Sequence, residues 1–276
     1  MNKRKAQTYE LRQNILDIVM AGNGGHIGGD MSVIDILSVL YFDIMNISPE
    51  NRTDPDRDYF VLSKGHSVEA LYAVLAAKGF FPLEEVLEKF SRFGSPFIGH
   101  PNNKLPGIEM NSGSLGHGLP VSVGMALASK KDNRPSCVYT VMGDGELAEG
   151  SVWEAAMAAA NYRLDNLCAT VDRNGLQISG STEDVMQLEE LAAKFQAFGW
   201  NVIVVKDGND VEQLKAAYEQ AQATKGKPTM VIANTVKGSG SAVMENKAQW
   251  HHKVPTQEEY QQISADFCER KESVLQ

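Results

Sequence analysis

Continuous apolar runs alternate with segments of helical periodicity through the second half of the chain. Short apolar runs predict buried strands, and segments with apolar residues three or four positions apart predict helices. The predicted strands are 59–62, 136–144, 166–175, 201–208 and 228–238, and the helices between the last four are 151–163, 188–199 and 211–224. This alternation is typical of βαβ units, so we expect an α/β fold with a mostly parallel sheet and helices on both faces.

The first half of the chain is expected to be mainly helical. Helical periodicity over 8–21 is followed by a Gly-rich break over 22–30. Further helices are predicted over 32–41, 67–79 and 121–129 and, as a C-terminal tail within 254–276, over 257–271. The segment 94–119 is rich in glycine and proline and lacks periodicity, and long irregular loops of this kind are more often functional. No stretch has the composition of a linker, so we expect a single domain over 1–276.

Composition excludes several classes of protein. The net charge is −9 and the basic residues are scattered, which argues against nucleic-acid binding. No apolar stretch approaches the length of a membrane span, so we expect no membrane segment and a cytoplasmic location. The three cysteines show no metal-binding spacing. Cys137 and Cys168 lie in apolar runs and are expected to be buried, reduced thiols.

The turn Gly143-Asp144-Gly145 stands between a predicted strand and a helix that starts near Ser151. Ligands of parallel sheets bind beyond the carboxyl ends of the strands, where helix N-termini attract anions. A carboxylate here would repel a phosphate unless a cation lay between them, and Mg²⁺ bridges carboxylates and phosphates. Asn174, and the carbonyl of Leu176, follow the next strand and supply further oxygens. Asp-Gly and Asn-Gly are also common turn formers, but two such turns at equivalent strand ends favour a metal–phosphate site.

The histidines lie in or beside predicted loops. All six are His26, His66, His100, His117, His251 and His252. A single loop histidine is usually a surface residue, but these stand in four segments that are rich in glycine or irregular. Histidine donates hydrogen bonds and moves protons near neutral pH. Several histidines in one cleft would suit a charged, polyhydroxylated substrate.

The spacing from Gly143-Asp144-Gly145 to Asn174, about 30 residues, resembles the thiamine diphosphate fingerprint. With the histidine segments "GNGGHIGGD", "LSKGHSVEALY", "GHPNNKLPGIEMNSGSLGHGL" and "TVKGSGSAVMENKAQWHHK" in this order, the chain resembles the N-terminal, diphosphate-binding half of transketolase over about 8–253. It is most similar to the split transketolases, in which this half is a separate subunit. The resemblance implies the thiamine diphosphate-binding (PP domain) fold, with thiamine diphosphate and Mg²⁺ as cofactors.

Site residues follow from the resemblance position by position. It implies that Mg²⁺ is held by Asp144, Asn174 and the carbonyl of Leu176. The histidines with implied catalytic roles are His26, His66, His100 and His251. The residues with implied contacts to the cofactor are His66, Gly113, Ser114, Leu115, Gly145, Glu149, Asn174 and His251. Glu149 corresponds to a carboxylate that communicates with the catalytic glutamate of the partner; without the resemblance it would be only a favourable acid near a helix start.

Four positions depart from the family pattern. Arg173 stands where the fingerprint usually has a first Asn. Ile27 replaces the common Pro, and His117 replaces a Gln. His252 replaces a usual Gly, which leaves open whether His251 or His252 acts. The departures at Ile27 and His117 bear on the identity of the sugar rather than on the cofactor.

The resemblance also implies a partner. Transketolases use a pyrimidine-binding domain that supplies the activating glutamate, and no such domain follows the tail helix in this sequence. We therefore expect a C-terminal partner subunit, in an α2β2 assembly, and transfer of a two-carbon ketol unit from a ketose, expected to be phosphorylated, to an aldose. The alternatives are a related enzyme such as a 1-deoxyxylulose-5-phosphate synthase, a ketol transferase for an unusual sugar, or a non-catalytic cofactor-binding subunit.

Overall fold

A computed structural model describes residues 2–276. At its centre lies a five-stranded sheet in the order β1-β2-β3-β7-β6, in which every neighbouring pair is parallel. The strands are β1 (Tyr59–Leu62), β2 (Val138–Gly143), β3 (Leu167–Arg173), β7 (Thr229–Asn234) and β6 (Asn201–Val205). A short antiparallel pair, β4 (Leu176–Gln177) and β5 (Gly180–Ser181), follows β3. The predicted α/β fold is confirmed.

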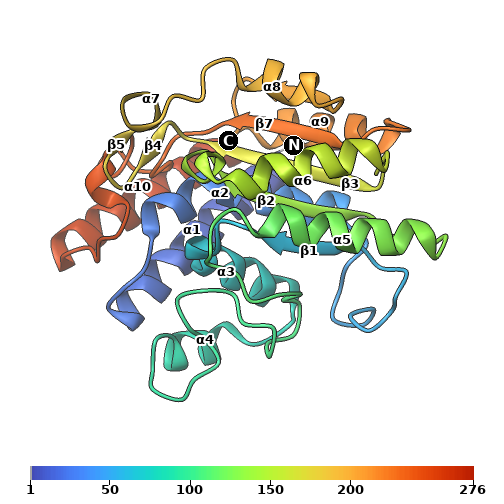
Figure 1. The fold of residues 1–276 in the computed structure, drawn as a ribbon. Coiled ribbons are helices and arrows are strands. Elements are labelled where there is room, and N and C mark those ends of the chain that lie inside the picture. Colours follow the sequence, from blue (N-terminus) through green and yellow to red (C-terminus); the bar gives the residue numbers. More distant parts are fainter. Residues whose placement is uncertain (1) are drawn as a thin grey trace.

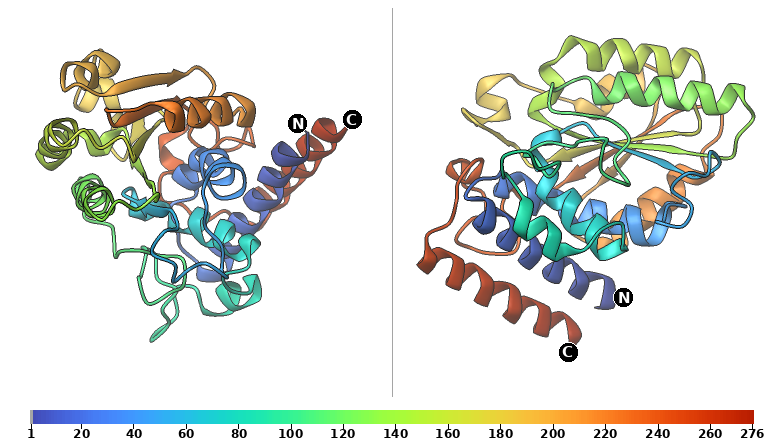
Figure 2. Two further views of the ribbon diagram at one scale, coloured as in Figure 1. Left: turned by 90° about the vertical axis from the view of Figure 1, so that its right-hand side faces the viewer. Right: turned by 90° about the horizontal axis from the view of Figure 1, so that it is seen from below.

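Helices cover both faces of the sheet (Figure 1). Two apolar clusters fill the interior, one on each side, because the strands are apolar on both faces. The helices of the first side are α1 (Asn2–Gly22), α2 (Ile27–Val39), α3 (Val68–Lys78) and α9 (Val211–Ala223), with α10 (Gln257–Leu275) packed on α1. The helices of the second side are α5 (Gly118–Lys131), α6 (Gly150–Asn161) and α8 (Leu191–Ala197). Figure 2 shows α1 and α10 side by side, with both chain ends at the same end of the pair.

The second helix begins earlier than expected. The pattern places its start at Ser32, but α2 begins at Ile27 and includes two glycines of the predicted break. Every residue of α2 is buried, and a Cβ atom at Gly28 would lie 2.5 Å from the carbonyl oxygen of Trp250. Close packing therefore keeps these glycines in a helix despite their low helix propensity.

Several further helical elements were not predicted. A π-helical turn, Leu40–Ile44, extends α2, and the short helices α4 (Leu83–Lys89) and α7 (Thr182–Val185) lie in loops. The irregular segment is confirmed, since neither helix nor strand lies between α4 and α5. It crosses the carboxyl ends of the strands, where the Ser112 hydroxyl donates to the carbonyl of Leu62 at 2.6 Å. Within residues 2–276, no helix combines the length and the apolar character that a membrane crossing requires.

Candidate functional site

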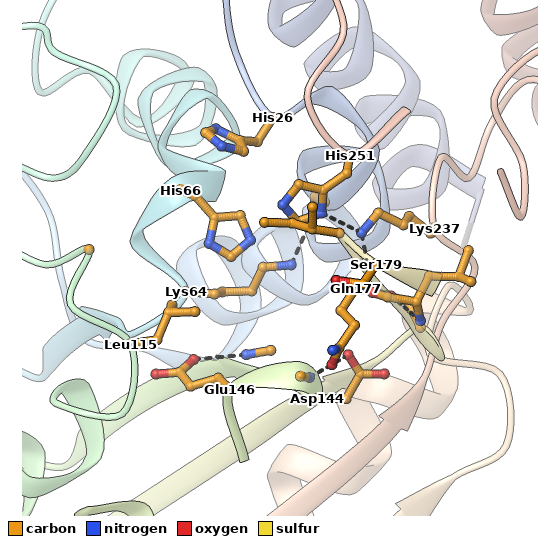
Figure 3. Close-up of a pocket in the computed structure, with 17 residues that line it drawn as sticks. His26, Lys64, His66, Leu115, Asp144, Glu146, Gln177, Ser179, Lys237 and His251 are labelled. Carbon is orange, nitrogen blue, oxygen red and sulfur yellow. Dashed lines mark hydrogen bonds between the residues drawn. The ribbon is translucent and has the colours of Figure 1, made fainter. Parts of the chain in front are cut away.

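A cavity of about 380 Å³ lies beyond the carboxyl ends of β1, β2, β3 and β7. The loops after these strands meet there with the N-terminus of α2 and the 251–252 segment. The lining residues are His26, Gly29, Lys64, His66, Gly113, Leu115, Gly143, Asp144, Gly145, Glu146, Asn174, Leu176, Gln177, Ile178, Ser179, Lys237 and His251. Figure 3 shows His26, His66 and His251 on one side of this space and the acids Asp144 and Glu146 on the other.

The Asp144 carboxylate joins the turns after β2 and β3. Its Oδ1 accepts from the backbone N–H of Gly145 at 2.9 Å. Its Oδ2 accepts from the N–H of Gly175 at 2.6 Å and from Arg173 Nη1 at 3.1 Å. Burial raises the pKa of the Asp144 carboxyl. The two turns singled out in the sequence therefore meet directly at the cavity.

Oxygen ligands suited to Mg²⁺ line the same wall. They are the Asp144 carboxylate, the Asn174 side-chain carbonyl, which accepts from the N–H of Leu176 at 3.1 Å, and the Leu176 backbone carbonyl. The carbonyl of Leu176 accepts from Lys237 Nζ at 3.2 Å. Mg²⁺ prefers hard oxygen ligands and binds proteins through one or two carboxylates, so this donor set fits the ion.

Two buried lysines give the cavity positive charge, and neither was predicted from the sequence to have a role. Lys64 Nζ pairs with the Asp172 carboxylate at 2.5 Å and donates to the carbonyl of Gly29 at 3.1 Å. Lys237 Nζ lies 2.8 Å from Nδ1 of His251. Burial, with Lys64 as a second cause, lowers the pKa of Lys237 to about 8. A signal was present, because each lysine precedes a glycine at or just beyond the C-terminal end of a predicted strand.

Five of the six histidines gather at one side of the cavity. The ring of His26 is central, 5.2 Å from His66 and 5.6 Å from His251 between centroids. His252 lies 4.7 Å and His100 6.3 Å from the same ring. The cluster unites four segments that are far apart in the chain, as expected of a common cleft.

The cavity keeps its histidines neutral. Burial, followed by the charges of His252 and His100, lowers the pKa of His26 to about 4. Burial and Lys237 lower the pKa of His251 to about 3, and burial and Lys64 lower the pKa of His66 still further. Burial also lowers the pKa of His100. Neutral imidazoles both donate and accept hydrogen bonds, which suits contact with sugar hydroxyls.

Three predicted site residues do not line the cavity. His100 stands behind Gly113, where an added Cβ atom would lie 2.5 Å from its Cδ2 atom. Ser114 is exposed, and its hydroxyl lies 3.3 Å from Nδ1 of His117. Glu149 is exposed at the N-cap of α6, beside Gly116.

Glu146 is a further buried residue that was not predicted from the sequence. Its carboxylate accepts from the Ser63 hydroxyl and from the N–H groups of Gly116 and Gly143, at 2.7 Å and 3.0 Å. It thus joins the loops after β1 and β2 to the irregular segment. Burial raises the pKa of the Glu146 carboxyl.

A sequence model described as "Transketolase, thiamine diphosphate binding domain" matches residues 3–271. The chain belongs to the transketolase family. Its relatives include an apulose-4-phosphate transketolase subunit of Phocaeicola vulgatus, with 47% identity over 97% of this chain and 95% of the relative. The 6-deoxy-6-sulfo-D-fructose transketolase subunit SqwG of Clostridium sp. (strain MSTE9) is 44% identical over 95% of this chain and 94% of the relative.

Solved transketolase structures share the fold over nearly the whole chain. The transketolase of Campylobacter jejuni superposes with a TM-score of 0.89 and 32% identity over 98% of this chain. The match covers 42% of the Campylobacter jejuni chain, so this transketolase chain spans less than half of the length of that structure. Its length is instead that of the relatives named as subunits.

Two residues that depart from the transketolase pattern, Arg173 and Ile27, can be placed in the structure. Arg173 donates to Asp144 and to the Thr182 hydroxyl, the latter at 2.6 Å, and pairs with Glu183. It thereby fastens the loop after β3 to the Asp144 turn. Ile27 is a buried first residue of α2.

Proposed function

We propose that this chain is the N-terminal subunit of a two-subunit, thiamine diphosphate-dependent transketolase. The enzyme would transfer a two-carbon ketol unit from a ketose to an aldose. The single observation that carries the proposal is one cavity that combines the Asp144–Asn174 oxygen ligands, two buried lysines and the histidine cluster. Membership of the transketolase family supports the same function.

In this proposal Mg²⁺ is held by Asp144, Asn174 and the carbonyl of Leu176. These ligands are oxygens, and one of them is an acid, as the ion requires. Lys64 and Lys237 supply positive charge for a diphosphate beside them. The proposed contacts to thiamine diphosphate are those of His66, Gly113, Ser114, Leu115, Gly145, Glu149, Asn174 and His251. When bound, thiamine diphosphate supplies the carbon nucleophile for ketol transfer.

The chain's own catalytic groups would be His26, His66, His100 and His251. As neutral imidazoles they would donate to and accept from the hydroxyls of the sugar and hold or move a proton at its oxygens. The cavity would orient the sugar beside the lysines. Glycine at position 145 lets the backbone lie close to the Gln177 side chain, because a Cβ atom there would lie 2.8 Å from Gln177 Oε1.

The proposed partner is a C-terminal chain with the pyrimidine-binding domain. This chain matches nearly the full length of relatives named as transketolase subunits and less than half of a full transketolase chain. In the assembly, which we propose to be α2β2 and cytoplasmic, Glu149 would face the partner. Its exposed position is compatible with that role.

The proposed substrates are sugars that carry an anionic group. Two relatives are named for apulose 4-phosphate and 6-deoxy-6-sulfo-D-fructose, which favours an unusual ketose that carries a phosphate or sulfonate group. The test is to supply the purified two-subunit complex with Mg²⁺, thiamine diphosphate and one of these two sugars or fructose 6-phosphate, with a common aldose acceptor. Transfer from at least one sugar supports the proposal, and no transfer from any of them would refute it.

A further inference from the structure

Two helices begin directly beside the histidine cluster. Helix α2 starts immediately after His26, and α3 starts two residues after His66. Each helix carries an acid in its first turn, Asp30 in α2 and Glu69 in α3. Neither acid has a role in the proposed cofactor or sugar contacts.

The two acids are buried together without sufficient hydrogen-bond donors. Both are completely inaccessible to solvent, and Asp30 contacts the backbone of Ala70, the residue that follows Glu69 in α3. Asp30 Oδ1 accepts from the N–H of Ala70 at 3.0 Å. Oδ2 of Asp30 and both carboxylate oxygens of Glu69 have no donor. Two adjacent buried carboxylates are unfavourable, and one proton between them removes a charge and supplies a donor.

The surroundings link this pair to the histidines. Glu69 packs against the turn before His26, since a Cβ atom at Gly25 would lie 2.6 Å from its Oε1. Tyr72, one turn along α3, donates to the carbonyl of Ile98 at 2.9 Å and to that of His100 at 3.4 Å. The charged and titratable groups that face the pair are Lys64 and Tyr72, and the backbone of His26 lies beside Glu69.

We propose that Asp30 and Glu69 share one proton and act as positioning residues, joining the first turns of α2 and α3 so that His26 and His66 are held across the cavity. This role rests on the proposed function, because it concerns the same histidines. The shared proton does not depend on the proposed function. Burial raises the pKa of Glu69 well above its ordinary value of 4.5, and burial raises the pKa of Asp30 as well.

The shared proton has a test in the full chain without cofactor. A carboxyl whose pKa is raised in the folded state stabilises the fold less and less as the pH rises above its unfolded pKa. Glu69→Gln mimics the protonated acid and still donates to Asp30. The histidines and Lys237 titrate in both chains, so the carboxyl pair is read from the difference between them. We expect the free energy of unfolding of the wild type, relative to that of Glu69→Gln, to fall as the pH rises from about 5 to 9. At about pH 8 the unfolding constant of Glu69→Gln should be at least about tenfold smaller than that of the wild type.

The matched control is Glu88→Gln, at an exposed acid of α4, which should keep the pH dependence of the wild type. A Glu69→Gln variant that follows the wild-type pH dependence, or is less stable than the wild type at about pH 8, would overturn the shared proton.

The positioning role is tested in the assembled two-subunit enzyme. Glu69→Ala should raise the KM for the ketose about tenfold, because the turn before His26 loses its support, while thiamine diphosphate affinity changes less than about twofold. Glu69→Gln should restore the wild-type KM. Equal effects of the two variants, or an unchanged KM in both, would overturn the positioning role. Failure of the proposed function would be distinct, since the wild-type complex would then transfer no ketol group.

Discussion

Lys64 and Asp172 form a buried ion pair directly beneath the cavity, with 2.5 Å between Nζ and Oδ2 and side-chain exposures of 2% and 0%. Asp172 is the register partner of Gly143, so the pair lies beside the Gly143-Asp144-Gly145 turn. Asp172 also accepts from the hydroxyls of Ser32, at 2.6 Å, and Thr235. The pair thus connects α2 and β3 to the loops after β1 and β7, and it keeps one cation next to the proposed diphosphate position.

Removal of one partner should destabilise the fold strongly. Asp172→Asn leaves the Lys64 charge buried without its counterion, which should cost about 3–5 kcal/mol in the free energy of unfolding. Urea denaturation of the full chain measures this loss. Combining Asp172→Asn with Lys64→Met should cost less than the sum of the single changes. Glu85→Gln, in an exposed ion pair with Lys89, is the matched control and should change stability little. If the double variant lost as much free energy of unfolding as the two single variants together, Lys64 and Asp172 would not be energetically coupled.

Asp144→Ala should abolish Mg²⁺-dependent binding of thiamine diphosphate to the assembled complex. The change removes the only carboxylate of the proposed ligand set and the acceptor of Gly175 and Arg173. Titration calorimetry with and without Mg²⁺ measures the binding. Asp132→Ala, at an exposed acid after α5, should bind as the wild type does. Unchanged affinity in the Asp144 variant would refute the metal assignment.

The histidine cluster should make the fold sensitive to acid. In the folded chain burial lowers the pKa of His26 to about 4 and that of His251 to about 3, from 6.5. Between the folded-state pKa values and 6.5, the unfolded state binds more protons than the folded state. The free energy of unfolding should therefore fall as the pH drops below about 6.5. Denaturation midpoints from about pH 7 to 4.5 measure the loss, and His26→Gln should make it smaller. An NMR titration in which the His26 ring protonates near pH 6.5 would contradict this explanation.

His252→Gly should change sugar preference while leaving the cofactor site intact. His252 packs on His26, stands where the transketolase family usually has glycine, and does not line the cavity beside Asp144. We predict that His252 donates one hydrogen bond to the sugar. Its loss should lower kcat/KM for the preferred ketose about fivefold, which corresponds to about 1 kcal/mol of transition-state stabilisation. Kinetics on the sugar panel would reveal this, with thiamine diphosphate affinity as the internal control. An equal decrease for every sugar would show that His252 does not determine specificity.

The sequence predicted the framework of the site better than its electrostatics. Apolar runs located β2 and β3, and the polar residues at their ends, Asp144 and Asn174, do meet at one edge of the sheet. The roles of Lys64 and Lys237 were missed. Lysine is rarely buried, and the pairing of Lys64 with Asp172 depends on the strand order, which periodicity does not give.

Local propensity also misplaced the start of α2. Gly28 and Gly29 indicate a break by propensity, but packing against Trp250 and Lys64 favours helix there. The fold class and the family are confirmed, whereas the single domain over 1–276 and the residue roles stay predictions. The pairing of Asp30 with Glu69 could not be predicted, because it requires knowing that the first turns of two helices meet.

The most direct test of the account is a ketol-transfer assay on three samples with Mg²⁺ and thiamine diphosphate: this chain alone, its C-terminal partner alone, and the two mixed. The account predicts transfer of the two-carbon unit only in the mixture, and its loss when the mixture contains Asp144→Ala. Transfer by this chain alone, or no transfer from any sugar of the panel by the mixture, would contradict it.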